Sequence, residues 1–271
     1  MNKVITLVDS KYFKYGEFFL LTRQRVNAKF ILYGPDLTAK QRKNLASRDI
    51  EYRQVDQELF NTHMQFLKFR FLRDEMDSGE EGAISFLDFD TFFVRDWHQI
   101  FNTPFDLGVT VRNDMIRNGL YRAYANGGVI FCRNTPKSAH LCDFAMKVMR
   151  EGGHPDLPEY DKIFTTLEQN RPAHKTHYRT TMRWWVDQVF LSSLVMRYVT
   201  IKGKESKPRI SDSEFFDYGS YRIGMFNCAR YNKLDPTLRD VDRKAKNKKA
   251  YILHLKDYGR SQMQSLRKLF G

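Results

Sequence analysis

The chain of 271 residues has no apolar run that approaches the roughly 18 residues needed to cross a bilayer. Residues 3–8 read as a first strand, whereas a secretory signal would need a longer apolar segment and a small-residue cleavage site. Internal repeats and low-complexity linkers are also missing. From these absences we expect one soluble, cytoplasmic domain over residues 1–271.

Cysteine is scarce, and the few cysteines are odd in number and widely spaced: Cys132, Cys142 and Cys228. Such a set forms neither a disulfide framework nor a zinc-binding pattern. A reducing compartment fits this usage.

Acidic residues are outnumbered, with 32 Asp and Glu against 45 Lys and Arg, which gives a net charge of +13. This balance favours polyanionic partners, such as nucleotide phosphates, nucleic acid or an anionic membrane surface, although simple solubility explains it as well. Two basic segments, 202–209 and 239–249, are expected to be exposed. The hydrophobic content of 42% supports a folded core rather than disorder.

Short apolar runs alternate with segments of helical length at the start of the chain. Strands are predicted at residues 4–9, 29–34 and 49–56, with helices at 11–26 and 38–47 between them. A β-α-β-α-β order favours an α/β fold with a mostly parallel central sheet flanked by helices.

A longer helix is predicted at residues 57–77, where apolar side chains recur at helical spacing. Lys68 and Arg70 fall largely off this apolar stripe. The stripe consists of Phe60, Met64, Leu67 and Phe71. Further strands are predicted at 84–87, 105–114 and 122–134, with helices near 138–151, 183–195 and 259–271, and late strands in 221–232 and 250–256.

The apolar run at residues 84–87 stops at Asp88, and Asp90 follows after one residue. Buried carboxylates are costly unless something positive neutralises them. In a strand, residues i and i+2 share a face, so both carboxylates could bind one Mg²⁺ or Mn²⁺ ion while Phe89 faces away. The alternative is a pair of strand-end caps or salt-bridged acids.

Three further motifs contain polar side chains that could contact a ligand. Asn126-Gly127-Gly128 is predicted as a turn that allows close backbone approach, with an amide for sugar hydroxyls. Asp187 and Gln188 lie near a predicted helix start, where Asp187 could equally be a cap. His254 precedes Lys256 by two residues, a spacing that could serve a metal and a phosphate together, although a lone histidine is usually structural.

The order of these pieces resembles the GT-A glycosyltransferases, and within them the glycogenin-like and galactosyltransferase-like group. The resemblance extends over residues 3–258 and implies a single Rossmann-like domain with a basic C-terminal extension. Residues 1–100 would form the nucleotide-sugar-binding half, residues 101–258 the acceptor and donor-sugar half, and residues 259–271 a C-terminal helix.

The resemblance implies a role for each matching position. Asp88, Asp90 and His254 match the metal ligands, for Mn²⁺ or Mg²⁺. Asp187 and Gln188 match the catalytic pair beside the anomeric carbon. The donor-binding positions are Val8, Asp9, Lys68, Arg70, Asn126, Gly127, Gly128 and Lys256. Residues 230–232 resemble an element before the last strand. The spacing "HLKDYGR" is shorter than the family's usual pattern and lacks its proline, which weakens the match of Lys256.

The function implied is a metal-dependent transfer of a sugar from a nucleotide-diphosphate sugar, with UDP as the expected nucleotide, to an acceptor hydroxyl. The motifs lean towards retention of configuration. The acceptor could be a glycan, a lipid-linked saccharide or hydroxylated bases in DNA. Residues 239–249 would then contact phosphates, or residues 259–271 would dock peripherally on a membrane surface.

Two other functions stay open. One is a basic nucleic-acid-binding protein without catalysis, although no known nucleic-acid-binding signature is present. The other is a nuclease or nucleotidyltransferase that uses Asp88 and Asp90, which would need further acids nearby. Asp96 and Asp106 are not convincingly spaced for that role.

Overall fold

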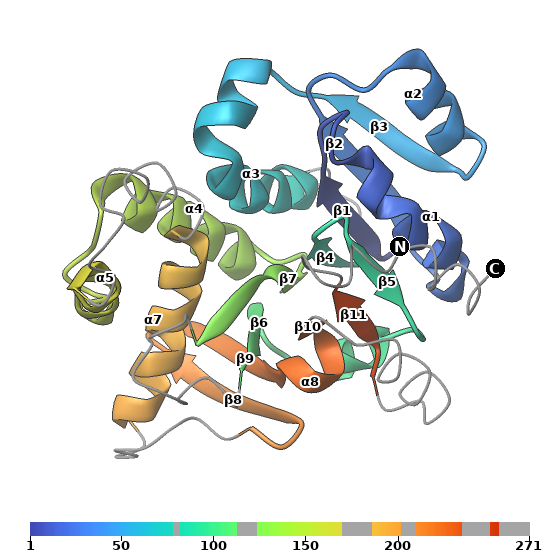
Figure 1. Cartoon of the computed structure of the whole chain (residues 1–271). Coiled ribbons are helices and arrows are strands. Elements are labelled where there is room, and N and C mark those ends of the chain that lie inside the picture. The colour runs from blue at the N-terminus through green and yellow to red at the C-terminus, as the bar shows by residue number, and fades with distance from the viewer. Residues whose placement is uncertain (78–81, 113–123, 170–185, 202–209, 235–249, 255–271) are drawn as a thin grey trace.

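The computed structural model describes residues 1–77, 82–112, 124–169, 186–201, 210–234 and 250–254. Within these residues the chain folds around an eight-stranded sheet with helices packed against it (Figure 1). No described helix is long and apolar enough to span a membrane. The segments 202–209, 239–249 and 259–271, together with Lys256, lie outside the described residues.

The main sheet is built from strands spread over most of the chain. Its order is β3-β2-β1-β4-β7-β6-β9-β8, and β7 and β8 run opposite to the other strands. The strands are β1 (Lys3–Leu7), β2 (Lys29–Gly34), β3 (Ile50–Gln54), β4 (Ala83–Leu87), β6 (Leu107–Val111), β7 (Ala125–Arg133), β8 (Ser213–Tyr218) and β9 (Tyr221–Asn227).

Helices follow the strands as the β-α-β opening predicts. They are α1 (Glu17–Thr22), α2 (Ala39–Ala46), α3 (Gln57–Asp77), α4 (Pro136–Glu151), α5 (Glu159–Gln169), α7 (Val186–Ile201) and α8 (Cys228–Tyr231), with 3-10 turns at Phe13–Gly16, Arg23–Arg25 and His98–Asn102. A small second sheet has the order β10 (Lys233–Leu234), β11 (Ile252–His254), β5 (Thr91–Phe93).

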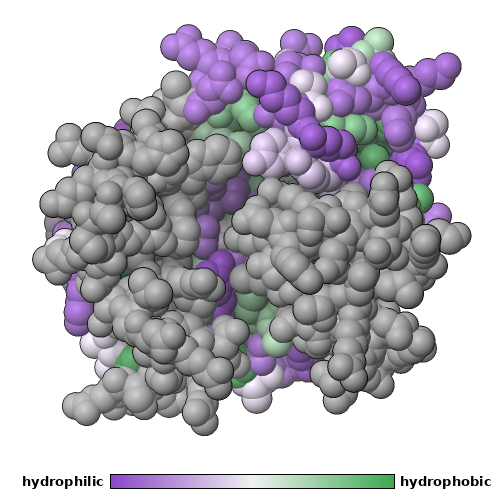
Figure 2. Space-filling view, in the orientation of Figure 1, coloured by the Kyte–Doolittle hydropathy of each residue, from purple (hydrophilic) through white to green (hydrophobic). Residues whose placement is uncertain are grey.

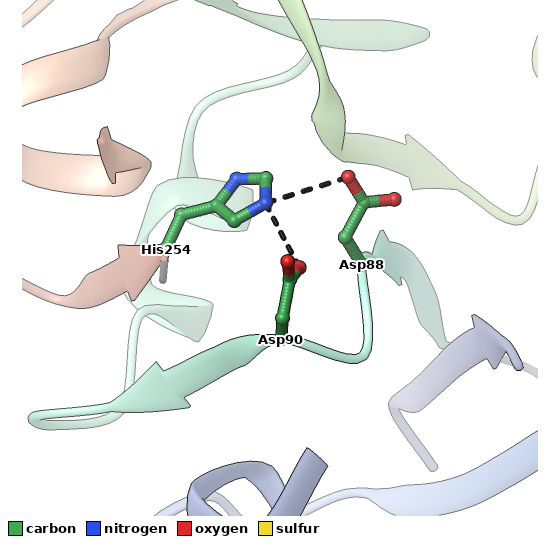
Figure 3. A group of neighbouring side chains, drawn as sticks. All are labelled: Asp88, Asp90 and His254. Carbon is green, nitrogen blue, oxygen red and sulfur yellow. Dashed lines mark ion pairs between the residues drawn. The ribbon is translucent and has the colours of Figure 1, made fainter. Parts of the chain in front are cut away.

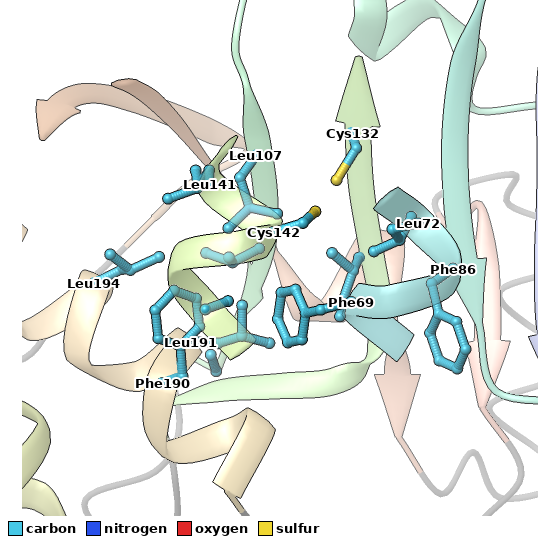
Figure 4. Packing of buried hydrophobic residues seen from close by; sticks show 14 of the residues in the cluster. Phe69, Leu72, Phe86, Leu107, Cys132, Leu141, Cys142, Phe190, Leu191 and Leu194 are labelled. Atoms are coloured by element: carbon cyan, nitrogen blue, oxygen red, sulfur yellow. The ribbon is translucent and has the colours of Figure 1, made fainter. Parts of the chain in front are cut away.

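Alternate side chains of the main sheet enter two different cores. Val4 and Phe30 belong to a cluster with α1 and the small sheet, whereas Ile5 and Ile31 belong to one with α3, α4 and α7. Figure 4 shows part of the second cluster, where Phe69 of α3 and Phe190 of α7 meet edge to face. Because side chains alternate along a strand, a sheet covered on both faces needs this apolar pattern on both sides.

The predicted elements are confirmed in type for most of the sheet, and α3 has the predicted bounds. The single helix predicted at residues 11–26 is wrong, because α1 is short and has a 3-10 turn on each side. Gly16 lies directly against the ring of Phe89, which an added Cβ would overlap. The strand β8 and the helix α5 were not predicted.

Surface and buried charges are separated along the first half of the chain. Of the residues of α2 only Leu45 is buried, and the region of α2 and β3 is mostly hydrophilic in Figure 2. Inside, Glu75 of α3 is fully buried and pairs with Lys3 of β1 at 2.9 Å. Its other oxygen accepts a hydrogen bond from Tyr33 (2.5 Å) and pairs with Arg53. Burial, together with Glu75, raises the pKa of Tyr33, so the hydroxyl stays a donor.

Removing this shared carboxylate should destabilise the fold strongly. Glu75→Ala leaves the buried ammonium of Lys3 without this partner, so we expect a loss of about 3–5 kcal/mol in the free energy of unfolding. Asp74→Ala is the matched control, because Asp74 is half exposed and pairs with exposed Arg70 on the same helix. It should cost less than about 1 kcal/mol. Urea unfolding measures both, and equal costs would contradict the stabilising role of Glu75.

Candidate metal and donor site

Asp88 and Asp90 lie directly after the buried strand, as predicted, but in the turn that joins β4 to β5, so the strand alternation assumed for them does not apply. The turn is held by a hydrogen bond from the Asp88 N–H to the Gly128 carbonyl (2.8 Å) and from the Thr91 N–H to the Asp88 carbonyl (3.1 Å). Phe89 is buried against Phe19, so it faces away from the carboxylates as predicted. The turn, rather than strand alternation, brings the two carboxylates together.

The small sheet brings His254 to these carboxylates. Strand β11 pairs antiparallel with β5, and His254 lies opposite Thr91. The Nε2 atom of His254 is 2.9 Å from Asp90 Oδ1 and 3.6 Å from Asp88 Oδ2 (Figure 3). One ligand atom from each residue lies within 4.8 Å of the others.

The chemistry of this donor set fits a divalent cation. Carboxylate oxygens suit Mg²⁺ and Mn²⁺, and the imidazole nitrogen adds a ligand typical of transition-metal sites, which favours Mn²⁺ over Mg²⁺. The structure therefore brings the three predicted metal ligands together.

Lys68 connects this cluster to helix α7. Its Nζ atom is 2.9 Å from Asp187 Oδ2, 3.0 Å from the Gly127 carbonyl and 3.5 Å from Asp88 Oδ1. Burial alone lowers the pKa of Lys68, but the charges of Asp187 and Asp88 outweigh burial and raise it. Burial also raises the pKa of Asp187, and the charge of Lys68 offsets only part of that effect. A buried lysine thus supplies one positive partner for the carboxylates.

Gly127 and Gly128 lie inside strand β7, so the predicted turn is wrong. Their need for glycine is steric. An added Cβ at Gly127 would overlap the carboxylate of Asp187, and one at Gly128 would lie 2.5 Å from His254 Cε1 and 2.6 Å from Asp88 Oδ2. The strand thus runs directly beneath the ion pair and the candidate metal ligands, as close backbone approach requires.

Asn126 is buried, and its side-chain oxygen accepts hydrogen bonds from the Gly128 N–H (2.8 Å) and from Asn232 Nδ2 (2.8 Å). Its own Nδ2 atom has no partner among the described residues, which leaves an amide donor for a ligand. Asn232 also lies 3.0 Å from His254 Nδ1. The sequence identified residues 230–232 only by resemblance and gave no reason for this contact.

The other predicted residues are placed around this centre. Gln188 follows Asp187 on α7, and its Oε1 atom is 3.4 Å from Arg112, a residue that sequence reasoning missed. Val8 is buried just beyond the end of β1, and Asp9 caps the turn that follows by accepting from the Tyr12 N–H (2.6 Å). Both follow a strand that pairs parallel with β4, at the edge where open α/β sheets bind ligands.

Arg70 is placed apart from this centre. It is half exposed on α3, and its Nε atom lies 3.8 Å from Asp74 Oδ2. Lys256, the last predicted donor contact, lies outside the described residues.

No protein-family model matches the chain, and no curated protein sequence matches it significantly. Among solved structures, the glycosyltransferase GlyE of Streptococcus pneumoniae TIGR4 is similar with a TM-score of 0.50 and 12% identity, over 95% of this chain and 55% of that one. A glycosyltransferase involved in glycosylation of the PBCV-1 major capsid has a TM-score of 0.46 and 10% identity, over 99% of this chain and 98% of that one. An active-site mutant of LgtC has a TM-score of 0.48 and 12% identity, over 98% of this chain and 95% of that one.

At these identities the likeness concerns the fold alone, and the similarity to GlyE carries it. This chain spans about half of GlyE, at 55% of its length. The chain therefore has the GT-A-like α/β fold that the sequence resemblance implies.

Removing the Lys68 charge should destabilise the protein in a pH-dependent way. Lys68→Met leaves Asp187 buried without this cation, so we expect a loss of about 3–5 kcal/mol at pH 7. The raised pKa of Lys68 means that its contribution is complete below the ordinary value of 10.5 and is lost as the pH rises through the higher folded value. The difference in the free energy of unfolding between wild type and Lys68→Met, measured with urea, should become smaller above pH 10.5.

Arg70→Met is the control for this experiment, because Arg70 is half exposed two residues along the same helix. We expect a change below about 1 kcal/mol. If the difference in the free energy of unfolding between wild type and Lys68→Met stays constant with pH, the ammonium charge is not what stabilises the site.

Adding one methyl group at Gly128 should damage the metal ligands. The Cβ of Gly128→Ala would displace His254 or Asp88, so we expect the affinity for Mn²⁺ to fall about 10- to 100-fold. Gly219→Ala is the matched control, because an added Cβ meets nothing within 4 Å there, although the φ of +58° would strain an alanine. Calorimetric titration with Mn²⁺ measures both variants, and unchanged affinity in Gly128→Ala would argue against a metal at this point.

Proposed function

We propose that this protein is a metal-dependent glycosyltransferase that moves a sugar from a nucleotide-diphosphate sugar to an acceptor hydroxyl. The observation that carries the proposal is the grouping of Asp88, Asp90 and His254, which Lys68 links to Asp187. This grouping lies at the ligand-binding edge of the sheet, in a fold shared with a glycosyltransferase.

The reaction breaks the bond between the anomeric carbon and the diphosphate oxygen, and forms a bond from that carbon to the acceptor oxygen. Negative charge then develops on the leaving diphosphate. A divalent cation held by Asp88, Asp90 and His254 would stabilise that charge as it forms. Lys256, two residues beyond His254, is proposed as a further cation for the diphosphate.

Asp187 suits charge stabilisation better than proton transfer. Its Oδ2 accepts from Lys68, and its Oδ1 accepts from the Gln188 N–H at 2.8 Å, so both oxygens are already hydrogen bonded. Gln188 is only partly buried, and its stem approaches Gly127. We therefore assign two roles to Asp187: it binds Lys68, and it stabilises the positive charge that develops on the sugar. Gln188 is assigned direct contact with the donor sugar.

This assignment favours retention of configuration, the outcome towards which the sequence motifs lean. Because both oxygens of Asp187 are already hydrogen bonded, Asp187 is a poor general base for an inverting reaction. In the retaining reaction the acceptor proton passes to an oxygen of the leaving diphosphate, which gains basicity as the bond breaks.

Several donor contacts follow from the positions around the cluster. The free amide donor of Asn126, beside Gly127 and Gly128, would bond a hydroxyl of the donor sugar. Val8 and Asp9, at the end of β1, would contact the nucleotide base, with UDP as the proposed nucleotide and Mn²⁺ as the proposed ion. Arg70 is half exposed, which favours Lys68 over Arg70 as the basic residue near the donor.

The acceptor is proposed to be a hydroxyl of a glycan, and the net charge of +13 favours an anionic one. Hydroxylated DNA remains the second candidate, and strongly salt-dependent DNA binding would identify it. A cytoplasmic location fits the three buried cysteines, none of which forms a disulfide bond. A nuclease with several metal ions is less favoured, because Asp96 instead contacts His98 and Asp106 instead accepts from the Arg222 N–H.

A screen of donor hydrolysis tests the proposed reaction. Nucleotide sugars are incubated with the protein, with and without Mn²⁺, and release of the nucleotide diphosphate is measured. We expect metal-dependent hydrolysis of one donor, and a loss of about 100-fold or more in Asp90→Asn, because removal of one stabilising group costs that much.

Asp217→Asn is the control, because Asp217 is exposed on the β8–β9 hairpin and pairs with Arg222. It should keep wild-type activity. Turnover that needs no metal and survives Asp90→Asn would rule out the metal assignment, and failure to bind any nucleotide sugar would favour a non-catalytic binding protein.

A further inference from the structure

Asn232 is fully buried, and every polar atom of its side chain contacts a group around the metal cluster. Its Nδ2 donates to Asn126 Oδ1 (2.8 Å) and to Thr110 Oγ1 (3.1 Å), and its Oδ1 lies 3.0 Å from His254 Nδ1. The one-turn helix α8 holds the backbone of Asn232, whose N–H donates to the Cys228 carbonyl (3.0 Å).

The direction of each hydrogen bond follows from one backbone group. The Gly128 N–H can only donate, so the atom of Asn126 that it meets is the oxygen. That oxygen accepts from Asn232, so the nearer atom of Asn232 is its nitrogen. The oxygen of Asn232 therefore faces His254, and the Nδ1 atom of His254 must carry the proton of this hydrogen bond.

In a neutral imidazole with its proton on Nδ1, the Nε2 atom is unprotonated, and this is the atom that faces Asp88 and Asp90 (Figure 3). Histidines that bind a metal through one nitrogen commonly donate the other ring N–H to an oxygen, which fixes the orientation of the ring. Asn232 occupies that place here. Its second contact, with Asn126, reaches the strand proposed to bind the donor sugar.

We propose that Asn232 is a positioning residue that holds His254 with its Nδ1 protonated and its Nε2 directed at the metal. Through Asn126, the same amide joins the metal ligand to strand β7. This inference rests on the metal site of the proposed function. An amide is suited to the position because one side must donate, to Asn126, while the other must accept, from His254.

Two variants separate this role from a merely structural one. Asn232→Ala removes the accepting oxygen, so the affinity for Mn²⁺ should fall about 10- to 100-fold, the range seen for groups that orient metal ligands. Asn232→Asp keeps an oxygen for His254 but loses the N–H that donates to Asn126, so its affinity for Mn²⁺ should fall less than that of Asn232→Ala. Loss of free Mn²⁺ from the electron paramagnetic resonance signal measures these affinities.

Asn227→Ala is the matched control. Asn227 is the residue before α8 and caps its start by accepting from the Ala229 N–H (2.9 Å), so the change perturbs the same helix without removing the contact with His254. Its Mn²⁺ affinity should equal that of wild type. A loss in Asn227→Ala as large as in Asn232→Ala would reduce Asn232 to a structural support and overturn the proposal.

A measurement on wild type makes the test independent of how the variants fold. Protein labelled with ¹⁵N-histidine is loaded with ¹¹³Cd²⁺, and His254→Gln assigns the signal of His254. We expect coupling of cadmium to Nε2 and a protonated Nδ1. Coupling to Nδ1, or wild-type Mn²⁺ affinity in Asn232→Ala, would overturn the role of Asn232. Wild type that binds neither metal would instead contradict the metal site of the proposed function.

Discussion

The arrangement of the site depends on one buried ammonium group, that of Lys68. Its ion pairs with Asp187 and Asp88 connect helix α3 to helix α7 and to the turn after β4. Its third contact, with the Gly127 carbonyl, adds strand β7. Burying charges costs several kcal/mol for each ion unless the partners are close and well bonded. Helices α3 and α7, the turn after β4 and strand β7 must therefore pack together closely. Glycine at positions 127 and 128 of β7 makes this possible, because a Cβ there would overlap Asp187, His254 or Asp88.

Much of this arrangement could be predicted from the sequence, since its signals are local. The apolar stripe of α3 defines the helix and places Lys68 off the stripe, and an acid on either side of Phe89 after an apolar run marks a strand end. The spacing of His254 and Lys256 suggested a metal contact, but only the resemblance connected His254 of β11 with Asp88 and Asp90, because His254 lies far along the chain and nothing near it points to Asp88. The order of motifs carried that information where local pattern did not.

The errors share a physical cause, which is contact between residues distant in the sequence. Residues 11–26 have helical length, but the ring of Phe89 lies against Gly16, at the junction between a 3-10 turn and α1. Asn126-Gly127-Gly128 has the composition of a turn, yet the glycines serve close approach inside a strand. The amide of Asn232 acts through partners on β6, β7 and β11, and no local spacing predicts such a contact.

The small sheet has a consequence for stability as well as for geometry. Strand β11 is short, and it is held by pairing with β5 and β10 and by contacts such as that of Tyr251 stacked on Tyr231. It nevertheless contributes one of the three candidate metal ligands. A ligand that binds the native state alone stabilises that state. A cation bound by Asp88, Asp90 and His254 would therefore hold β11 against β5, so that metal binding and docking of this late strand reinforce each other.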